Sequence, residues 1–285
     1  MRGMKRWESR RRTARSVAAW AALGSLLLGF GVGGAAAESG TLRVGISETY
    51  PPLAFQKDGV PAGAEVDLAR AVGKRLGEEV VFVPMSFAEL VPALEEGRVD
   101  VVMSGLSVTA ERSEKVRFAE PYLRVGQMAL IRANDLGRSV DPGKMGAKGS
   151  RVGVKKATTG EGWAKANLPD ATVVSFDTVE DGTTALENEE VDYFVHDAPT
   201  VWRLTGRFDT RNEALAAIYR PLTKEYLAWA VGPDDEQLVE KLNTALAGLR
   251  ESGQLRDILD TWIPVTKVAV PDDAPQPTAA PPTAP

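Results

Sequence analysis

PALEEGRVDVVMSG (residues 92–105) and TALENEEVDYFVHD (residues 184–197) align without a gap and share Ala, Leu, Glu, Val and Asp at equivalent places. Each segment has the pattern of a helix end, a turn and a short strand rich in apolar residues. The match alone leaves coincidence open, because helix-turn-strand units resemble one another. We interpret it as a sign of two similar α/β halves, each of which ends a strand at a common cleft.

The same alternation of short strands and periodic helices runs through the rest of the chain. Runs rich in branched residues predict strands at 42–46, 80–83, 99–103, 151–154, 172–176 and 191–195. Such alternation predicts mostly parallel sheets flanked by helices, and these sheets bind ligands beyond the carboxyl ends of their strands. Ser104 and Gly105 lie at one such end, and His196 and Asp197 lie at another.

The two ends of the chain differ from this middle part. Residues 1–37 combine seven basic residues with an apolar run and three alanines at 35–37, which predicts an export signal. Residues 9–11 match a twin-arginine signal only weakly. Ordinary secretion is therefore favoured, and both export routes stay open. Residues 266–285 form a proline-rich tail that we expect to be disordered.

Charge and cysteine content exclude several classes of partner and site. The chain has a formal net charge of −5, and loss of residues 1–37, with seven basic and one acidic residue, changes it to −11. Such an acidic protein is not expected to bind nucleic acid or an anionic membrane. The chain has no cysteine, which excludes disulfides, thiolate metal sites and a lipid anchor on cysteine. The remaining length, about 225 residues, suits one large or two small domains.

The segment MSGLSVTAERSEKVRFAEPY (103–122) has the chemistry of a carboxylate site. Its small residues let backbone N–H groups approach a ligand, and Thr109 begins a short helix that carries Arg112. A guanidinium holds both oxygens of a carboxylate in a fork, while Ser107 can donate a further hydrogen bond. The alternative is a surface arginine on a capped helix.

Several segments together resemble the extracytoplasmic solute-binding proteins of amino-acid ABC transporters (family 3). The resemblance covers nearly all of residues 41–263, and its most specific motif is the segment that carries Arg112. The other landmarks are YPPLAF (50–55), GAEVDLA (63–69), VGVKKATTGEGWA (152–164), VDYFVHDAP (191–199), YLAWAV (226–231) and LNTALAGLRESGQLRDILDTW (242–262).

The resemblance implies a type II periplasmic-binding-protein fold. In this α/β fold two lobes, each a mostly parallel sheet flanked by helices, are joined by two hinge strands and close over an amino acid. Lobe 1 would comprise residues 41–125 and 223–265, and lobe 2 would comprise residues 126–222. The crossings would lie near 124–129 and 220–226.

The resemblance also implies which residues hold the carboxylate of the ligand. Arg112 would bind the α-carboxylate, with help from Ser107 and Thr159, and Thr158 is expected among the other ligand-binding residues.

The α-ammonium would be held by Asp197 together with groups at Gly105, and the neighbouring Ser104 is expected to face the same ligand site. Tyr50 and Phe87 would flank the ligand side chain, although both could be ordinary core aromatics. The ammonium and the carboxylate on the α-carbon of an amino acid each need a partner of opposite charge in a partly dry cleft. Because Arg112 and Asp197 would come from different lobes, binding would depend on closure of the two lobes.

Residues near the expected side-chain pocket bear on selectivity. Lys155 and His196 resemble the polar pocket of glutamine-binding members. Ser47 stands where several members carry an acidic residue, although Glu48 is adjacent. This pattern favours a polar neutral or acidic amino acid over a basic one. Ala157 replaces a glycine common in the family, so the backbone there is less permissive and the hydroxyl contacts that follow it are less firmly expected.

The alternative functions are catalytic. Adjacent strand residues point to opposite faces, so His196 and Asp197 are not expected to form a dyad, and His196 could simply lie at the cleft rim. One histidine and no cysteine do not supply a transition-metal site, so we expect no metal and no cofactor. An enzyme of the same fold, resembling a cyclohexadienyl or arogenate dehydratase, would use Glu48 or Glu161 as its acid. We expect instead a periplasmic, monomeric, non-enzymatic protein without a lipid anchor, which delivers a free L-amino acid to an inner-membrane ABC permease.

Overall fold

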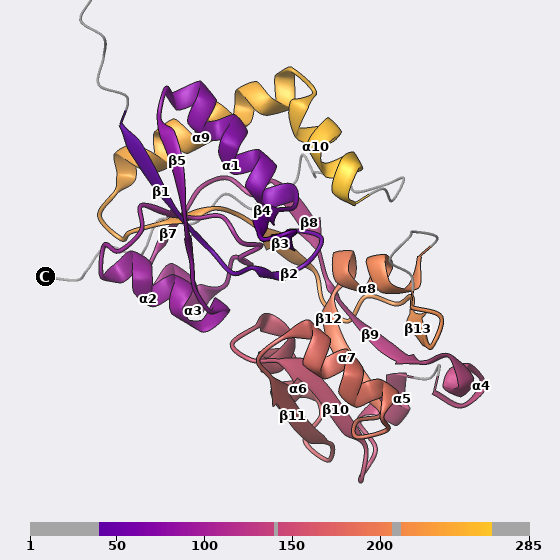
Figure 1. The fold of residues 1–285 in the computed structure, drawn as a ribbon. Helices are drawn as coiled ribbons and strands as arrows, with labels where there is room; N and C mark the ends of the chain where they lie inside the picture. The colour runs from indigo at the N-terminus through magenta and orange to yellow at the C-terminus, as the bar shows by residue number, and fades with distance from the viewer. Residues whose placement is uncertain (1–39, 140–141, 207–211, 264–285) are drawn as a thin grey trace, which may run out of the picture. The chain divides into compact units, whose positions relative to one another are not determined.

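The computed structural model describes residues 40–139, 142–206 and 212–263, so the expected export signal and proline-rich tail lie outside the described residues. Two five-stranded sheets organise the described chain, in the orders β5-β1-β6-β15-β7 and β11-β10-β12-β9-β13 (Figure 1). In each sheet three neighbouring strands are parallel and the strands beyond them add antiparallel pairs. This is the two-lobe α/β architecture that the sequence predicts.

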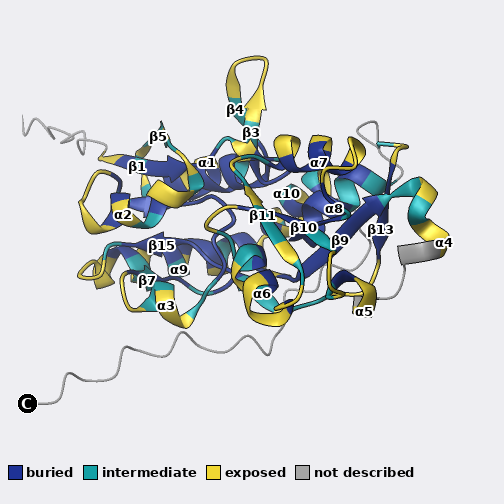
Figure 2. Ribbon diagram, turned by 90° about the horizontal axis from the view of Figure 1, so that it is seen from below, coloured by how far each residue is buried: buried dark blue, intermediate teal, exposed yellow. Residues whose placement is uncertain are grey.

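Lobe 1 contains the first sheet and its helices. Its strands are β1 (Thr41–Ile46), β5 (Glu79–Pro84), β6 (Val101–Val102), β7 (Arg117–Phe118) and β15 (Ala230–Val231), with a small sheet of β2 (Thr49–Tyr50), β3 (Ala54–Lys57) and β4 (Val60–Ala62). Its helices are α1 (Ala64–Leu76), η1 (Phe87–Glu89), α2 (Leu90–Glu95), α3 (Ala110–Ser113), α9 (Glu236–Glu251) and α10 (Gln254–Trp262). Helices α1, α9 and α10 pack together, and α2 packs against β1 and β6. Figure 2 shows buried β1 and β15 and an exposed β3–β4 hairpin.

Lobe 2 contains the second sheet. Its strands are β9 (Gln127–Arg132), β10 (Arg151–Lys155), β11 (Thr172–Phe176), β12 (Tyr193–Asp197) and β13 (Leu215–Ile218). Its helices are η2 (Ala133–Asp135), α4 (Leu136–Ser139), α5 (Pro142–Met145), α6 (Thr159–Asn167), α7 (Val179–Glu187) and α8 (Ala198–Thr205). Side chains of α7 and α8 pack with Phe194 on one side of the sheet, and side chains of α6 pack with Val195 on the other. The alternation along β12 therefore separates two apolar layers.

Two short strands connect the lobes. Strand β8 (Leu123–Val125) pairs antiparallel with β14 (Glu225–Leu227), and the chain enters lobe 2 after β8 and leaves it before β14. Ser107 of lobe 1 forms an isolated antiparallel bridge with Leu227. The hinge is therefore hydrogen-bonded directly to the loop that carries the predicted carboxylate site.

An aspartate that precedes a strand accounts for part of the sequence echo. In lobe 1, Asp100 accepts hydrogen bonds from the Arg43 backbone N–H (2.7 Å) and from Arg43 Nη2 (2.6 Å). In lobe 2, Asp192 accepts them from the Arg151 backbone N–H (2.9 Å) and Nη2 (2.6 Å). The two aspartates are equivalent in the aligned segments. In each lobe the aspartate of the repeated Val-Asp therefore ties the residue before one strand, β6 or β12, to the neighbouring strand, β1 or β10. It also explains why the strands begin after the aspartates, at 101 and 193, rather than at 99 and 191.

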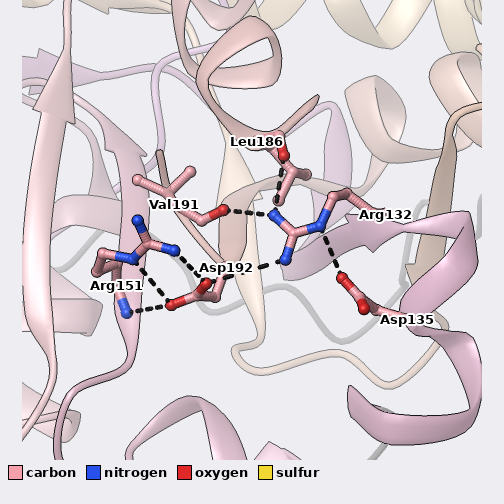
Figure 3. A network of polar contacts seen from close by, with 6 residues as sticks. All are labelled: Arg132, Asp135, Arg151, Leu186, Val191 and Asp192. Carbon is pink, nitrogen blue, oxygen red and sulfur yellow. Dashed lines mark hydrogen bonds and ion pairs between the residues drawn. The ribbon is translucent and has the colours of Figure 1, made fainter. Parts of the chain in front are cut away.

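The lobe 2 aspartate belongs to a larger polar network (Figure 3). Arg132 Nε lies 2.7 Å from Asp135 Oδ2, and Arg132 Nη1 donates to the carbonyl oxygens of Leu186 (3.0 Å) and Val191 (2.8 Å). Burial raises the pKa of Asp192, but the hydrogen bonds from Arg151 outweigh it and the net pKa is lowered. The network joins β9, β10 and the turn after α7.

Among the described residues, no helix is long and apolar enough to cross a membrane.

Candidate functional site

A pocket with a cavity volume of about 10 Å³ lies where the two lobes meet. It contains ten of the eleven residues that the sequence predicts as ligand-binding: Tyr50, Phe87, Gly105, Ser107, Arg112, Lys155, Thr158, Thr159, His196 and Asp197. They come from both lobes, mostly from strand ends and the loops that follow. This volume is close to that of one water molecule, so an amino acid can enter only if the lobes or the lining side chains move apart.

Arg112 lies on α3, whose first turn is capped by Thr109: the Arg112 backbone N–H donates to Thr109 Oγ1 (3.2 Å). Its side chain donates from Nη1 to the Ser107 carbonyl oxygen (2.8 Å) and from Nη2 to the Ala157 carbonyl oxygen of lobe 2 (3.2 Å). Burial lowers its pKa, which nearby carboxylates partly offset, but a guanidinium stays charged. Since a guanidinium has five N–H donors, these two bonds leave capacity for a ligand.

The loop after β6 is held by a buried carboxylate that sequence reasoning missed. Glu65 Oε1 accepts from the Gly105 backbone N–H and from Tyr122 Oη (both 2.6 Å), and Glu65 Oε2 accepts from Trp229 Nε1 (3.1 Å). The Gly105 N–H is therefore directed to Glu65 rather than to the pocket. Gly105 has φ +67°, and a Cβ there would lie 2.5 Å from Tyr50 Cε1, so only glycine fits without a shift.

The structure places Ser104 outside the pocket lining. Its Oγ accepts a hydrogen bond from the Ser47 backbone N–H (2.9 Å), so it supports the end of β1. Ala157 adopts φ +60°, in the left-handed region where glycine is favoured. The glycine that is common in the family at this position is thus explained by the backbone conformation, which Ala157 adopts here despite its side chain.

Asp197 ends β12 and is buried between the lobes. Its carboxylate accepts hydrogen bonds from Tyr50 Oη of lobe 1 and from Gln127 Nε2 of β9. Burial, followed by the negative charge of Glu225, raises the pKa of Asp197 to about 7. A ligand cation would reverse this effect, because an adjacent positive charge favours the ionised carboxylate.

Lys155 is buried at the end of β10. Its Nζ donates to Thr49 Oγ1 of lobe 1 (3.1 Å) and lies 5.6 Å and 5.3 Å from the ring centroids of Tyr50 and Phe87. Arg112 Cζ also lies 5.6 Å from the Phe87 ring centroid, so both aromatic rings contact cations. Burial lowers the pKa of Lys155 to about 8.

His196 shares a sheet face with Phe194, whose ring lies 6.1 Å away and nearly parallel, and meets Tyr50 edge-on at 5.1 Å. Both ring nitrogens are buried without a hydrogen-bond partner in the described structure. Burial, followed by the charge of Lys155, lowers the pKa of His196 to about 3, so the ring is neutral. No hydrogen bond joins the His196 ring to Asp197, so the two residues form no dyad.

The pocket hydroxyls are directed to different partners. Thr158 Oγ1 donates to the Lys155 carbonyl oxygen (2.6 Å) and accepts from the Glu161 N–H (3.3 Å), which caps α6. Ser107 Oγ and Thr159 Oγ1 both donate to Glu225 Oε2 (2.7 Å each). Glu225 begins the hinge strand β14 and Gln127 begins β9; neither has a local sequence signal, and neither was predicted.

The fold and the pocket define a class of protein: a two-lobed binding protein with facing cationic and anionic groups in the interlobe pocket. The profile of the bacterial extracellular solute-binding proteins, family 3, matches residues 42–265. The ABC transporter arginine-binding protein 1 of Escherichia coli (strain K12) is 32% identical over 85% of this chain and 98% of its own length. The chain therefore belongs to the bacterial extracellular solute-binding proteins, family 3.

Solved structures and one enzyme extend the comparison. An ancestral arginine-binding protein bound to arginine has a TM-score of 0.71 at 32% identity, covering 78% of this chain and 98% of that one. Such a protein bound to glutamine has a TM-score of 0.69 at 32% identity, covering 78% and 97%. Cyclohexadienyl dehydratase of Pseudomonas aeruginosa (strain ATCC 15692) is 28% identical over 79% of this chain and 84% of its own length. Among the described residues, no group of three or more His, Asp or Glu is arranged to hold a metal ion.

Proposed function

We propose that this protein is the substrate-binding component of an amino-acid ABC transporter and captures one free L-amino acid between its lobes. The observation that carries the proposal is the presence of Arg112 and Asp197 in one small pocket that both lobes line. A guanidinium suits an α-carboxylate and a carboxylate suits an α-ammonium. The family membership and the named relatives support the same class of ligand.

The lining favours a ligand whose side chain is polar and neutral, as in glutamine, or acidic. Lys155 is a buried cation among the side chains that would meet the ligand side chain, and a second buried cation beside it would be repelled. Ser47 supplies no carboxylate, and Glu48 Oε2 bonds to Gln56 Nε2 (2.7 Å) without lining the pocket. Basic ligands are the alternative, because the named relatives include arginine-binding proteins.

The proposal extends to the organisation of the chain and its partners. Residues 1–37 serve as the export signal, lobe 1 comprises 41–125 and 223–265, and lobe 2 comprises 126–222. The hinge pair β8–β14 supports the two crossing points. The protein acts as a monomer in the periplasm, without a lipid anchor, and passes its ligand to an inner-membrane permease. Its net charge of −5 supports the absence of a nucleic-acid partner.

An enzyme of the dehydratase type is the second candidate, because one relative carries that name. Neither acid that the sequence offers is suited to the role. Glu161 accepts from Lys165 Nζ, Ser175 Oγ and the Ala157 N–H (2.7 Å each). Burial raises its pKa, but these bonds outweigh it and leave the pKa lowered, which favours the carboxylate over the acid. Prephenate or arogenate incubated with the protein should yield no aromatic product.

A thermal-shift screen against the common amino acids tests the proposal. A ligand at about 100 times its dissociation constant should add roughly 2.7 kcal/mol to the free energy of unfolding. We expect glutamine or an acidic amino acid to give the largest shift, and Arg112→Ala and Asp197→Ala each to remove most of that shift at the same ligand concentration while the protein stays folded. Absence of a shift with every amino acid would refute the proposal. A largest shift with arginine would refute only the assigned selectivity.

A further inference from the structure

Glu225, at the first position of β14, accepts hydrogen bonds from three hydroxyl groups. Ser107 Oγ of lobe 1 and Thr159 Oγ1 of lobe 2 both donate to its Oε2 atom (2.7 Å each). Thr223 Oγ1 donates to its Oε1 atom (2.7 Å). Ser107 and Thr159 line the pocket, whereas Glu225 lies behind them. One carboxylate oxygen of the hinge is thus bonded to pocket hydroxyls from both lobes.

These hydrogen bonds compete with ligand binding. A serine or threonine hydroxyl has a single hydrogen to donate. While Ser107 and Thr159 donate to Glu225, they cannot donate to the carboxylate of a ligand. They are also the two hydroxyls that, with Arg112, would hold an α-carboxylate under the proposed function.

We propose that Glu225 is an internal competitor for the carboxylate subsite, holding the Ser107 and Thr159 hydroxyls that an incoming ligand must take over. The inference rests on the proposed function, because it requires a ligand with a carboxylate. Its consequence is that Glu225 lowers the affinity for the ligand and assists its release. Glu225 is therefore an affinity-determining residue that acts through Ser107 and Thr159.

The charge of Glu225 acts in the same direction as its hydrogen bonds. A carboxylate placed against the same two hydroxyls is repelled by a second carboxylate. Glu225 also raises the pKa of Asp197, which disfavours the ionised form that would bind an ammonium. The cations that oppose this effect at the pocket are Arg112 and Lys155, whose pKa values are both lowered by burial. Removal of Glu225 should therefore strengthen binding at both ends of the ligand.

Calorimetric titration of Glu225→Ala and Glu225→Gln with the amino acid found by the screen tests this proposal. We expect Glu225→Ala to bind about three- to tenfold more tightly than the unsubstituted protein, the value of one hydrogen bond no longer in competition. Glu225→Gln should show a smaller gain, because its amide oxygen still accepts but carries no charge. Glu190→Gln, at an exposed site after α7, makes the same charge change and should leave the affinity unaltered.

A double-mutant cycle separates competition from a general effect on structure. In a Thr159→Val background one of the two hydroxyls that Glu225 holds is absent, so the gain from Glu225→Ala should shrink. Weaker binding by both Glu225 variants would show that Glu225 supports the subsite and would overturn the proposal. An unchanged affinity, or a gain that persists in full with Thr159→Val, would overturn it as well. Failure of the unsubstituted protein to bind any amino acid would instead overturn the proposed function.

Discussion

Replacement of Asp197 by asparagine should stabilise the ligand-free protein while it abolishes binding. The Asp197 carboxylate is buried beside the charge of Glu225, and its pKa is raised from 3.8 to about 7. Because the folded state favours the protonated form, ionisation of Asp197 costs stability. That cost is absent below the unfolded pKa near 4, grows as the pH rises, and is complete above 7. An asparagine of the same size carries no charge and has no such cost.

The magnitude follows from the two pKa values. The difference between a pKa of 3.8 and one of about 7 corresponds to roughly 4 kcal/mol at pH 8, and to about 1.5 kcal/mol at pH 5. These are upper limits, because asparagine also loses charge-assisted hydrogen bonds from Tyr50 and Gln127. In a folded part of this size, a gain of 2–4 kcal/mol raises the melting temperature by roughly 5–15 °C.

Urea unfolding at pH 5 and pH 8 measures this effect. Both proteins are refolded from denaturant first, because any ligand carried through purification would stabilise only the unsubstituted protein. Asp170→Asn, at an exposed position after α6, is the matched control and should change neither stability nor its pH dependence. If Asp197→Asn is no more stable at pH 8, or if its gain is the same at both pH values, the assigned environment of Asp197 is wrong.

Four further predictions concern the pocket and its supports. Ligand affinity should fall as the pH drops from 7 to 5, by up to about tenfold per unit, because protonated Asp197 does not attract an ammonium; calorimetry should also detect proton release at pH 7. Lys155→Met should weaken the binding of glutamate relative to arginine. In the unsubstituted protein, Lys155 loses its charge above its pKa of about 8, so glutamate affinity should fall there, and Lys155→Met should not show this fall. Gly105→Ala should eliminate binding and destabilise the fold by about 1–3 kcal/mol, because its Cβ would meet the Tyr50 ring at φ +67°; unfolding and titration report the two effects. Asp192→Ala should cost about 1 kcal/mol in urea unfolding with an unchanged dissociation constant, since its partners Arg151 and Arg132 have side chains 41% and 20% exposed and lie away from the pocket lining.

The sequence predicted the fold class because hydrophobic patterning is a local property. Strands β1, β5, β10 and β11 follow apolar runs that the sequence shows directly. Short strands such as β7, β8, β14 and β15 have two or three residues, too few for a period to be recognised. Their pairing depends on long-range register, which no local pattern contains.

The pocket lining followed from motifs, whereas its supporting residues did not. Ten predicted residues meet in one pocket. The segments that resemble the family indicated them, among them the segment that carries Ser107 and Arg112 and the strand that ends at Asp197. Gln127 and Glu225 act through contacts to residues 70 and 66 positions away in the chain, namely Asp197 and Thr159. A glutamine or a glutamate at the first position of a strand carries no signal for such a contact.

The central claim is that Arg112 binds the α-carboxylate and Asp197 binds the α-ammonium of the same amino acid. Calorimetric titration with the preferred amino acid, its α-carboxamide and its α-deamino analogue tests it most directly, in the unsubstituted protein and in Arg112→Ala. The unsubstituted protein should discriminate against both analogues by at least about tenfold, the value of one charged hydrogen bond. Arg112→Ala should lose the discrimination against the carboxamide and keep that against the deamino analogue. Equal binding of all three ligands, or full discrimination against the carboxamide in Arg112→Ala, would contradict the claim.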